Sequence, residues 1–230
     1  MKNVMILSGA GLSAPSGLKT FRDNNGLWEE YDVMEVCSAS AFRKNPKKVL
    51  DFYDMRRAEL AKVKPNHAHF VLAKLKAKFP QNIFMLTQNV DDLLERANCK
   101  DVIHLHGFLP QLRCLECGKI FNIGYESREH QICPFCKSAN LRHHIVMFEE
   151  QASEYQTLYT LLEKTHLFIS IGTSGEVLPV GHYARMCEKS ILNLLESDES
   201  LEACFNKVYK EDIIKAVDKI ALDVEEFLSV

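Results

Sequence analysis

The sequence predicts an α/β protein built on an open, mostly parallel sheet, because short apolar runs alternate along the chain with helical patterns. The run at residues 4–7 is continuously apolar, as in strands that are buried on both faces, and the short, mainly apolar runs at 82–86 and 167–171 repeat this pattern. Each run leads into a polar, turn-rich loop. Ligands of such sheets bind at the carboxyl ends of the strands, so these loops are where a ligand site is expected.

Weaker patterns complete the predicted sheet and its helices. A fourth strand is expected at residues 190–193, and helical spacing of apolar residues covers 44–62, 67–78, 152–164 and 213–227. The chain between the first polar loop and the second of these helices has no strand pattern. We therefore expect a helical excursion there.

Length, composition and charge describe a large globular domain with a small insert. The chain has 230 residues, of which 47% are hydrophobic and 26% charged, which excludes disordered and collagen-like proteins. The 28 basic and 31 acidic residues give a net charge of −3, which argues against a nucleic-acid partner. No apolar run approaches the ~18 residues of a membrane-spanning helix, and the start of the chain does not read as a signal peptide. We expect a cytoplasmic protein with reduced thiols and no membrane partner, whose oligomeric state the sequence leaves open.

Four of the eight cysteines predict a zinc ribbon. The pairs Cys114-x-x-Cys117 and Cys133-x-x-Cys136 are separated by fifteen residues, which is zinc-ribbon spacing. Two tight turns joined by a hairpin would aim four thiolates at one point and form a tetrahedral zinc site. Because four thiolates fill the coordination shell, this zinc should be structural. The other cysteines are expected to be ordinary thiols.

The first polar loop carries a glycine pattern, Gly9-x-Gly11-x-x-Ala14, that is typical of dinucleotide-binding turns. We expect it to open a helix, with the glycines letting backbone N–H groups approach a phosphate. The alternative is an ordinary turn between a strand and a helix. The acidic residue that should end a second strand is not found in a strand-like context, so a dinucleotide would be held differently from that of a standard dehydrogenase.

Several short motifs occur in order along the chain. They are the first glycine loop with Phe21-Arg22, Gly26-Leu27-Trp28, Thr87-Gln88-Asn89-Val90-Asp91, His106-Gly107, the four-cysteine ribbon and Gly172-Thr173-Ser174. Together they resemble the sirtuins, the NAD-dependent protein-lysine deacylases, over residues 4–193. The likeness is closest to the bacterial sirtuins that remove acidic acyl groups.

The resemblance implies a Rossmann-like fold with a small module made of helices and a zinc ribbon. On this basis the NAD-binding domain comprises residues 1–22, 70–107 and 142–230. The helical part of the small module is 23–69, and the ribbon is 108–141.

The resemblance also implies an activity. In sirtuins the acyl oxygen of the substrate lysine attacks the nicotinamide ribose of NAD, and the products are nicotinamide, free lysine and O-acyl-ADP-ribose. His106 matches the family's general base, and its ordinary pKa of about 6.5 suits that role. His104 faces the same way in an extended segment, so geometry alone does not choose between them. The adjoining Gly107 and the family pattern choose His106.

The predicted NAD contacts follow from the same resemblance. Asn89 and Asp91 match residues that hold the nicotinamide carboxamide and a water near the ribose, and with His106 they form the predicted catalytic group. Phe21 is expected to shield the reactive intermediate. The other predicted cofactor-binding residues are Gly9, Ala10, Gly11, Ser13, Arg22, Gln88, Val90, Gly172, Thr173, Ser174 and Asn193. Any one of them alone would be read as a helix cap or a turn residue.

Tyr53 and Arg56 have the Y-x-x-R spacing that marks the acidic-acyl subclass. An i, i+3 pair shares one helix face, where a phenol and a guanidinium together can bind a carboxylate. The alternative is a solvated helix face. Val146 and Phe148 match the substrate-binding segment of the family. The glycine usual after it is Glu149 here, which we expect to crowd or repel an acidic peptide.

The prediction is therefore an NAD-dependent deacylase acting on succinyl-, malonyl- and acetyl-lysine in protein substrates. Two alternatives are an NAD-dependent protein ADP-ribosyltransferase and a non-enzymatic zinc-ribbon binding module. The ribbon lacks a strong basic stripe, which argues against nucleic acid as the ligand of such a module.

Overall fold

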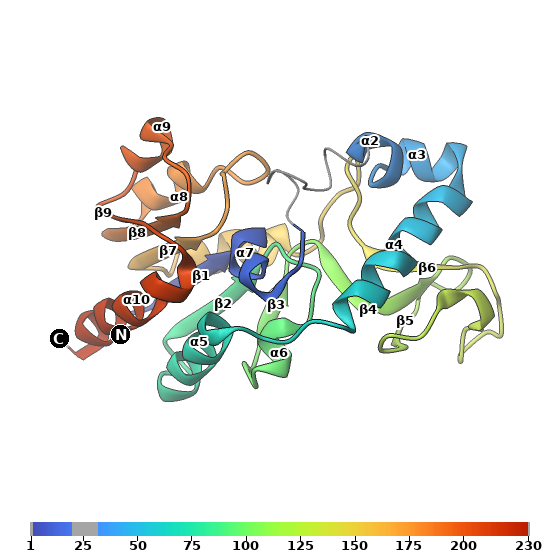
Figure 1. Ribbon diagram of the computed structural model, residues 1–230, viewed down its shortest axis with the longest axis horizontal. Coiled ribbons are helices and arrows are strands. Elements are labelled where there is room, and N and C mark those ends of the chain that lie inside the picture. The colour runs from blue at the N-terminus through green and yellow to red at the C-terminus, as the bar shows by residue number, and fades with distance from the viewer. Residues whose placement is uncertain (1, 20–31, 230) are drawn as a thin grey trace.

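The computed structural model describes residues 2–19 and 32–229, and its centre is a six-stranded parallel sheet (Figure 1). The strands lie in the order β3-β2-β1-β7-β8-β9, which is the 3-2-1-4-5-6 order of doubly wound nucleotide-binding sheets. Their bounds are Val4–Ser8 for β1, Ile83–Thr87 for β2, Val102–His104 for β3, Leu167–Ile171 for β7, Lys189–Leu194 for β8 and Lys207–Lys210 for β9. The predicted open parallel sheet is confirmed.

The two edge strands, β3 and β9, were not predicted. Both are short and only partly buried, and β9 has an exposed lysine at each end. An edge strand lacks a neighbour on one side and is often kept short and charged. It therefore does not show the continuous apolar run by which the central strands were found.

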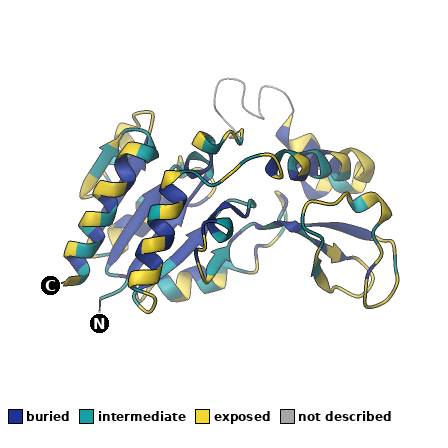
Figure 2. Ribbon diagram, turned by 60° about the horizontal axis from the view of Figure 1, so that its bottom comes forward, coloured by how far each residue is buried: buried dark blue, intermediate teal, exposed yellow. Residues whose placement is uncertain are grey.

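Helices cover both faces of the sheet, and the central strands alternate between the two cores (Figure 2). Val4 and Ile6 of β1 point into one core, while Met5 and Leu7 point into the other. The first core is closed by α5 (His67–Lys78), α6 (Leu93–Arg96) and α10 (Ile213–Ser229), and the second by α7 (Tyr155–Leu162), α8 (Val180–Met186) and α9 (Glu199–Glu202). Among the helices described, none is long and apolar enough to cross a membrane.

A second module lies beside the large sheet, at the right of Figure 1. Its antiparallel sheet has the order β5-β4-β6, with β4 at Gly107–Cys114, β5 at Ile120–Asn122 and β6 at Leu141–Ile145. Three helices pack on it, namely α2 (Val33–Val36), α3 (Ala39–Lys44) and α4 (Pro46–Leu60). Their shared core includes Phe52, Tyr53, Leu109 and Ile145. The ribbon and the helical excursion therefore form one unit.

Two elements fall across the domain boundaries drawn from the sequence. β6 pairs with β4, so residues 142–145 lie in the sheet of the small module. Helix α5 begins at His67 and packs against α10, so residues 67–69 lie with the large sheet.

The glycine loop after β1 does not open an α-helix, which corrects our expectation. It forms two 3-10 turns, η1 (Ala10–Leu12) and η2 (Ala14–Ser16). Pro15 has no N–H, so a continuous α-helix would lack the bond from residue 15 to the carbonyl of Gly11. Gly17 then ends the segment in the left-handed region, with φ of 95°.

A buried arginine joins α4 to the antiparallel sheet. The side chain of Arg57 is 1% exposed, and its Nε donates to the Leu109 carbonyl at 2.9 Å. Its other nitrogens donate to the carbonyls of Gln111 and Glu126 and approach Asp54 at 3.4 Å. Burial lowers the pKa of Arg57 to about 10, which still leaves it charged at neutral pH.

We expect Arg57→Met to lower the free energy of unfolding by about 3 kcal/mol, because it leaves buried carbonyls without their donor and removes one of the charged partners of Asp54. Urea denaturation followed by circular dichroism measures this. Arg43→Met on α3 is the control, since that side chain is 73% exposed. Equal stability of the two variants would contradict the assignment.

Candidate active site at the centre of the sheet

Two glycine loops meet where the strand order reverses, between β1 and β7. The N–H of Gly9 donates to the Ile171 carbonyl at 2.8 Å, and the N–H of Gly11 donates to the Gly172 carbonyl at 2.9 Å. A Cβ on Gly11 would lie 2.6 Å from the Gly172 Cα, and Gly172 has φ of 59°. These glycines therefore allow two backbones to touch. The N–H groups of Gly9 and Gly11 are used in this contact, and the predicted approach of the loop's backbone to a phosphate stays a prediction.

Side chains from the loop after β2 bind the first glycine loop. Asn89 donates through Nδ2 to the Gly9 carbonyl at 3.0 Å and to Ser13 Oγ at 3.1 Å. Ser13 Oγ in turn donates to Asp91 Oδ2 at 2.9 Å. His69 of α5 lies 3.4 Å from the same hydroxyl through Nε2, and its Nδ1 accepts from the Asn66 N–H. The predicted Ser13, Asn89 and Asp91 thus form one connected network.

Burial shifts the pKa values of two groups in this network. Burial raises the pKa of the Asp91 carboxyl, although hydrogen bonds from the Leu93 N–H and Ser13 act in the opposite direction. Burial lowers the pKa of His69 to about 4, so this ring is neutral at neutral pH. With Nδ1 as an acceptor, the neutral His69 ring carries its proton on Nε2 and donates it toward Ser13.

His106 is held as a neutral imidazole with its lone pair on Nε2. Its Nδ1 lies 3.1 Å from the Gln88 carbonyl, which can only accept, so Nδ1 carries the proton. Its Nε2 lies 2.9 Å from the hydroxyl of Tyr155, which donates to it. Burial lowers the pKa of His106, and the Gln88 contact only partly opposes this. A base with a defined tautomer results.

His104 differs from His106 in the partner of its second nitrogen. Its Nδ1 faces the Asn89 carbonyl at 3.0 Å and its Nε2 faces a Glu95 carboxylate oxygen at 2.7 Å. Both partners accept, so these contacts favour the ring that carries a proton on each nitrogen. Burial opposes that charge, but the bond to Glu95 outweighs it and the pKa of His104 is raised. Such a ring has no lone pair for a base, so the geometry distinguishes two histidines that spacing could not.

The remaining predicted cofactor residues that the structure describes lie outside the hydrogen-bond network of Ser13, Asn89 and Asp91. Gln88 Nε2 donates to Thr173 Oγ1 at 3.1 Å, which links the loop after β2 to the loop after β7. Asn193 is 2% exposed and its amide donates to the carbonyls of Tyr209 and Glu211, so its donors join β8 to the end of β9. Ala10, Val90 and Ser174 lie in the same loops, and Ser174 is exposed. Phe21 and Arg22 lie outside the described residues.

The predicted acyl-carboxylate pair lies on α4, but its two members differ in access. Tyr53 is 6% exposed, its ring is in the core of the small module, and its hydroxyl lies beside the thiol of Cys37. Arg56 donates to Glu59 at 2.6 Å and to the Lys19 carbonyl at 3.3 Å. The guanidinium already holds a carboxylate, and an acyl carboxylate would have to replace Glu59.

The substrate-side segment after β6 contains Val146, Phe148 and the unusual Glu149. Phe148 is 37% exposed, and Val146 is half-buried and donates through its N–H to the His106 carbonyl at 2.9 Å. Glu149 has φ of 71°, which explains physically why a glycine suits this position. Its carboxylate accepts from the N–H and the hydroxyl of Ser40 on α3. The side chain is therefore held on α3, whereas we expected it to crowd the peptide.

The four ribbon cysteines converge, as their spacing predicts. Their sulfur atoms all lie within 4.8 Å of one another, with 3.5 Å between Cys114 and Cys136 and 3.6 Å between Cys117 and Cys133. A tetrahedral zinc with bonds of about 2.3 Å requires sulfur atoms about 3.8 Å apart, so the cluster fits this ion. Burial alone would raise the pKa of the Cys133 thiol, but backbone N–H groups of residues 135 and 136 help lower it to about 7.

The relationship of this chain to known proteins agrees with this geometry. Residues 9–179 match the profile of the Sir2 family. The chain belongs to the Sir2 family. A relative from Campylobacter jejuni named NAD-dependent protein deacylase is 74% identical over 228 residues, covering 99% of this chain and 98% of its own. A Helicobacter hepaticus relative with the same name is 40% identical over 252 residues, covering 99% of each chain.

Solved structures of the Sir2 family have the same fold. A Sir2 homologue mutant in complex with ADP-ribose superposes with a TM-score of 0.87 at 30% identity, covering 100% of this chain and 94% of its own. A Sir2 homologue in complex with NAD gives a TM-score of 0.85 at 30% identity, covering 99% and 91% of the two chains.

Two side chains beside the site of this Sir2-family chain were missed in the sequence. Tyr155 contacts His106 from the start of α7, and His69 contacts Ser13 from the first turn of α5. Neither belongs to a local motif, and Tyr155 lies 49 positions from its partner. Only folding brings these pairs together, so no spacing rule could have indicated them.

We expect Cys117→Ser to abolish stoichiometric zinc binding and to lower the melting temperature by about 10 °C. The ribbon core is small, containing only four buried residues in its described cluster, so it depends on the ion. Metal analysis and thermal denaturation test this. Cys204→Ser is the control, since that half-buried thiol lies outside the cluster. Full zinc content in Cys117→Ser would contradict the four-cysteine site.

Proposed function

We propose that this chain is an NAD-dependent protein-lysine deacylase that removes succinyl, malonyl and acetyl groups and produces nicotinamide and O-acyl-ADP-ribose. The observation that carries the proposal is the neutral His106, whose Nε2 lone pair lies among the loops at the centre of the sheet. The names of the Campylobacter and Helicobacter relatives support the same activity.

The loops around the strand-order reversal would hold NAD. Gly9 and Gly172 leave no room for a Cβ between the two backbones, and polar side chains of Gln88, Asn89 and Thr173 surround that contact. The polar side chains around this contact fit a ligand that makes several hydrogen bonds. Bound NAD supplies a ribose carbon that accepts the acyl oxygen as nicotinamide leaves.

The role we assign to His106 is to take a proton at Nε2 from a ribose hydroxyl. The Nδ1–H bond to the Gln88 carbonyl becomes charge-assisted when the ring is protonated, so it stabilises the product of that step. Tyr155 occupies Nε2 before the reaction and must give up this hydrogen bond to the substrate. His104 keeps its charge through Glu95 and serves as a fixed neighbour.

Recognition of an acidic acyl group is assigned to Arg56, with Tyr53 behind it. The Arg56 side chain is 14% exposed, so a carboxylate reaching it would be largely shielded from water. Glu59 marks the position that such a carboxylate would take. The uncharged acetyl group gains nothing from this guanidinium.

The decisive experiment compares acetyl, succinyl and malonyl versions of one lysine peptide with NAD and zinc-loaded protein. We expect NAD-dependent loss of each acyl group, with O-acyl-ADP-ribose detected by mass spectrometry. Intact acyl-lysine after long incubation would refute the proposal. ADP-ribose retained on protein from labelled NAD would instead indicate an ADP-ribosyltransferase.

Arg56→Met should reduce kcat/KM for the succinyl peptide by roughly 100-fold, the scale of a lost charge-assisted contact in a shielded site. The acetyl peptide should change only a few-fold. The exposed Arg43→Met variant should leave the ratio of the two substrates unchanged. Equal losses for both peptides in Arg56→Met would contradict the carboxylate role.

Tyr155→Phe should raise kcat/KM by up to about fivefold, because it removes a hydrogen bond that competes for Nε2. The activity of both forms should fall as pH drops through the pKa of His106, below 6.5, since burial disfavours the imidazolium. Steady-state rates between pH 5 and 8 measure both effects. A fall in kcat beyond about tenfold would show instead that the tyrosine hydroxyl takes part in the reaction.

The cytoplasmic location, the lack of nucleic-acid and membrane partners and the domain boundaries stay predictions. The acylated lysines of protein substrates are the partners that the proposed reaction requires.

A further inference from the structure

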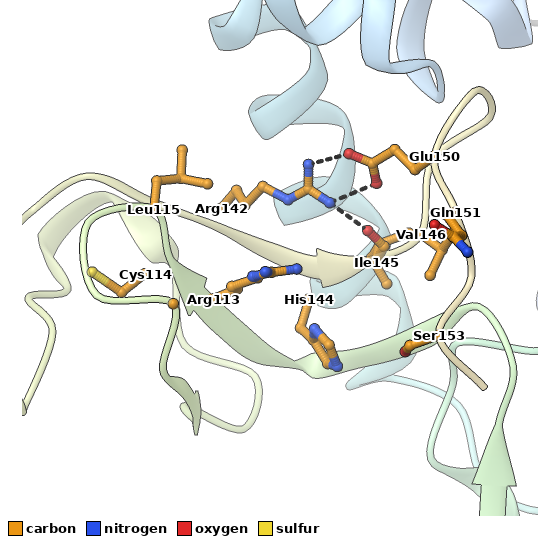
Figure 3. A pocket seen from close by; sticks show the side chains of 11 residues that line it. Arg113, Cys114, Leu115, Arg142, His144, Ile145, Val146, Glu150, Gln151 and Ser153 are labelled. Atoms are coloured by element: carbon orange, nitrogen blue, oxygen red, sulfur yellow. Dashed lines mark hydrogen bonds and ion pairs between the residues drawn. The ribbon is translucent and has the colours of Figure 1, made fainter. Parts of the chain in front are cut away.

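A cavity of about 430 Å³ with both polar and apolar lining lies beside β6, between the ribbon and the segment that leads to α7 (Figure 3). Arg113 of β4 and His144 of β6 lie close together in it, and Arg142, Val146, Gln151 and Ser153 also line it. Residues 142, 144 and 146 alternate along an extended segment, so they share one face. The reaction proposed above assigns no step to this cavity.

One of the two arginines is neutralised inside the protein. Arg142 makes a two-pronged ion pair with Glu150, at 2.6 and 2.7 Å, and also donates to the Ile145 carbonyl. Its side chain is only 10% exposed, yet its buried Nε has no hydrogen-bond partner within the described part of the chain. The Arg142–Glu150 ion pair therefore forms one polar side of the cavity, and the Nε–H of Arg142 is left without a hydrogen-bond partner among the described residues.

The other arginine, Arg113, is less fully paired. It is exposed and no carboxylate of the described residues forms an ion pair with it, although its charge acts on Glu150 and helps lower the pKa of that carboxyl. Burial lowers the pKa of His144, and Arg113 and Arg142 lower it further, while Glu154 acts the other way without reversing the shift. His144 is therefore a neutral donor or acceptor beside a guanidinium, that of Arg113, which has no ion pair among the described residues.

We propose that the Arg113–His144 cavity receives the carboxylate of an aspartate or glutamate that flanks the acyl-lysine in the substrate protein. This rests on the proposed function, because Val146 lines the cavity and also belongs to the predicted substrate-binding segment. The guanidinium of Arg113 and the ring N–H of His144 can donate to the same carboxylate. A substrate strand beside Val146 would bring its own side chains to this face.

The cavity is separate from the predicted acyl-carboxylate site. Ile145 and Met147 belong to the core that contains Tyr53, whereas His144 and Val146 do not, although Ile145 also borders the cavity. An acetyl-lysine peptide therefore tests the cavity without involving Arg56.

The experiment measures binding of fluorescent acetyl-lysine peptides by anisotropy, with deacetylation rates recorded in parallel. One glutamate is moved through the flanking positions, and each peptide is paired with its glutamine counterpart. We expect one position at which glutamate binds about fivefold more tightly than glutamine, a preference that weakens at high salt. Arg113→Gln should abolish it, and Arg113→Glu should shift the preference to lysine.

The matched control is Arg185→Gln, an exposed arginine in the last turn of α8 that should keep the preference for glutamate. Zinc content and melting temperature of each variant verify that the ribbon is intact. Absence of any glutamate preference, or its persistence in Arg113→Gln, would overturn the proposal. An Arg113-dependent preference without deacetylation would support the cavity and refute the proposed function.

Discussion

The packing of one glycine loop against another at the centre of the sheet is the contact on which the site depends. Two N–H groups of the loop after β1 donate to carbonyls at the end of β7, and neither backbone leaves space for a Cβ. Because the loops touch, Asn89 from the loop after β2 can bind Gly9 and Ser13 together. One backbone contact thus positions polar groups from three strands at a single edge of the sheet.

The same loop after β2 also sets the chemistry of two histidines. Consecutive carbonyls, those of Gln88 and Asn89, accept from Nδ1 of His106 and His104 respectively. What separates the rings is the second nitrogen, which meets the Tyr155 hydroxyl in one case and the Glu95 carboxylate in the other. The two rings therefore differ in the form that their partners favour. The Glu95 carboxylate stabilises a protonated His104, whereas the Tyr155 hydroxyl donates to a neutral His106.

The small module depends on polar anchors because its apolar cores are small. Arg57 joins α4 to three carbonyls, and the cysteine cluster joins the two ends of the ribbon. With these anchors in place, the segment after β6 presents two different faces. Ile145 and Met147 pack in the core that contains Tyr53, and His144 and Val146 line the cavity beside Arg113.

The sequence by itself determined the central strands, four helices, the cysteine cluster and the order of the Sir2 motifs, because each depends on local periodicity or short spacing. It did not reveal the edge strands, which lack a buried second side, or the 3-10 turns that Pro15 imposes after β1. Only the tertiary structure decided that the second nitrogen of His106 meets a hydroxyl while that of His104 meets a carboxylate, and that Glu149 turns toward Ser40. The reason is physical: protonation state and side-chain direction depend on partners distant along the chain, such as Tyr155, that reach these groups only through folding.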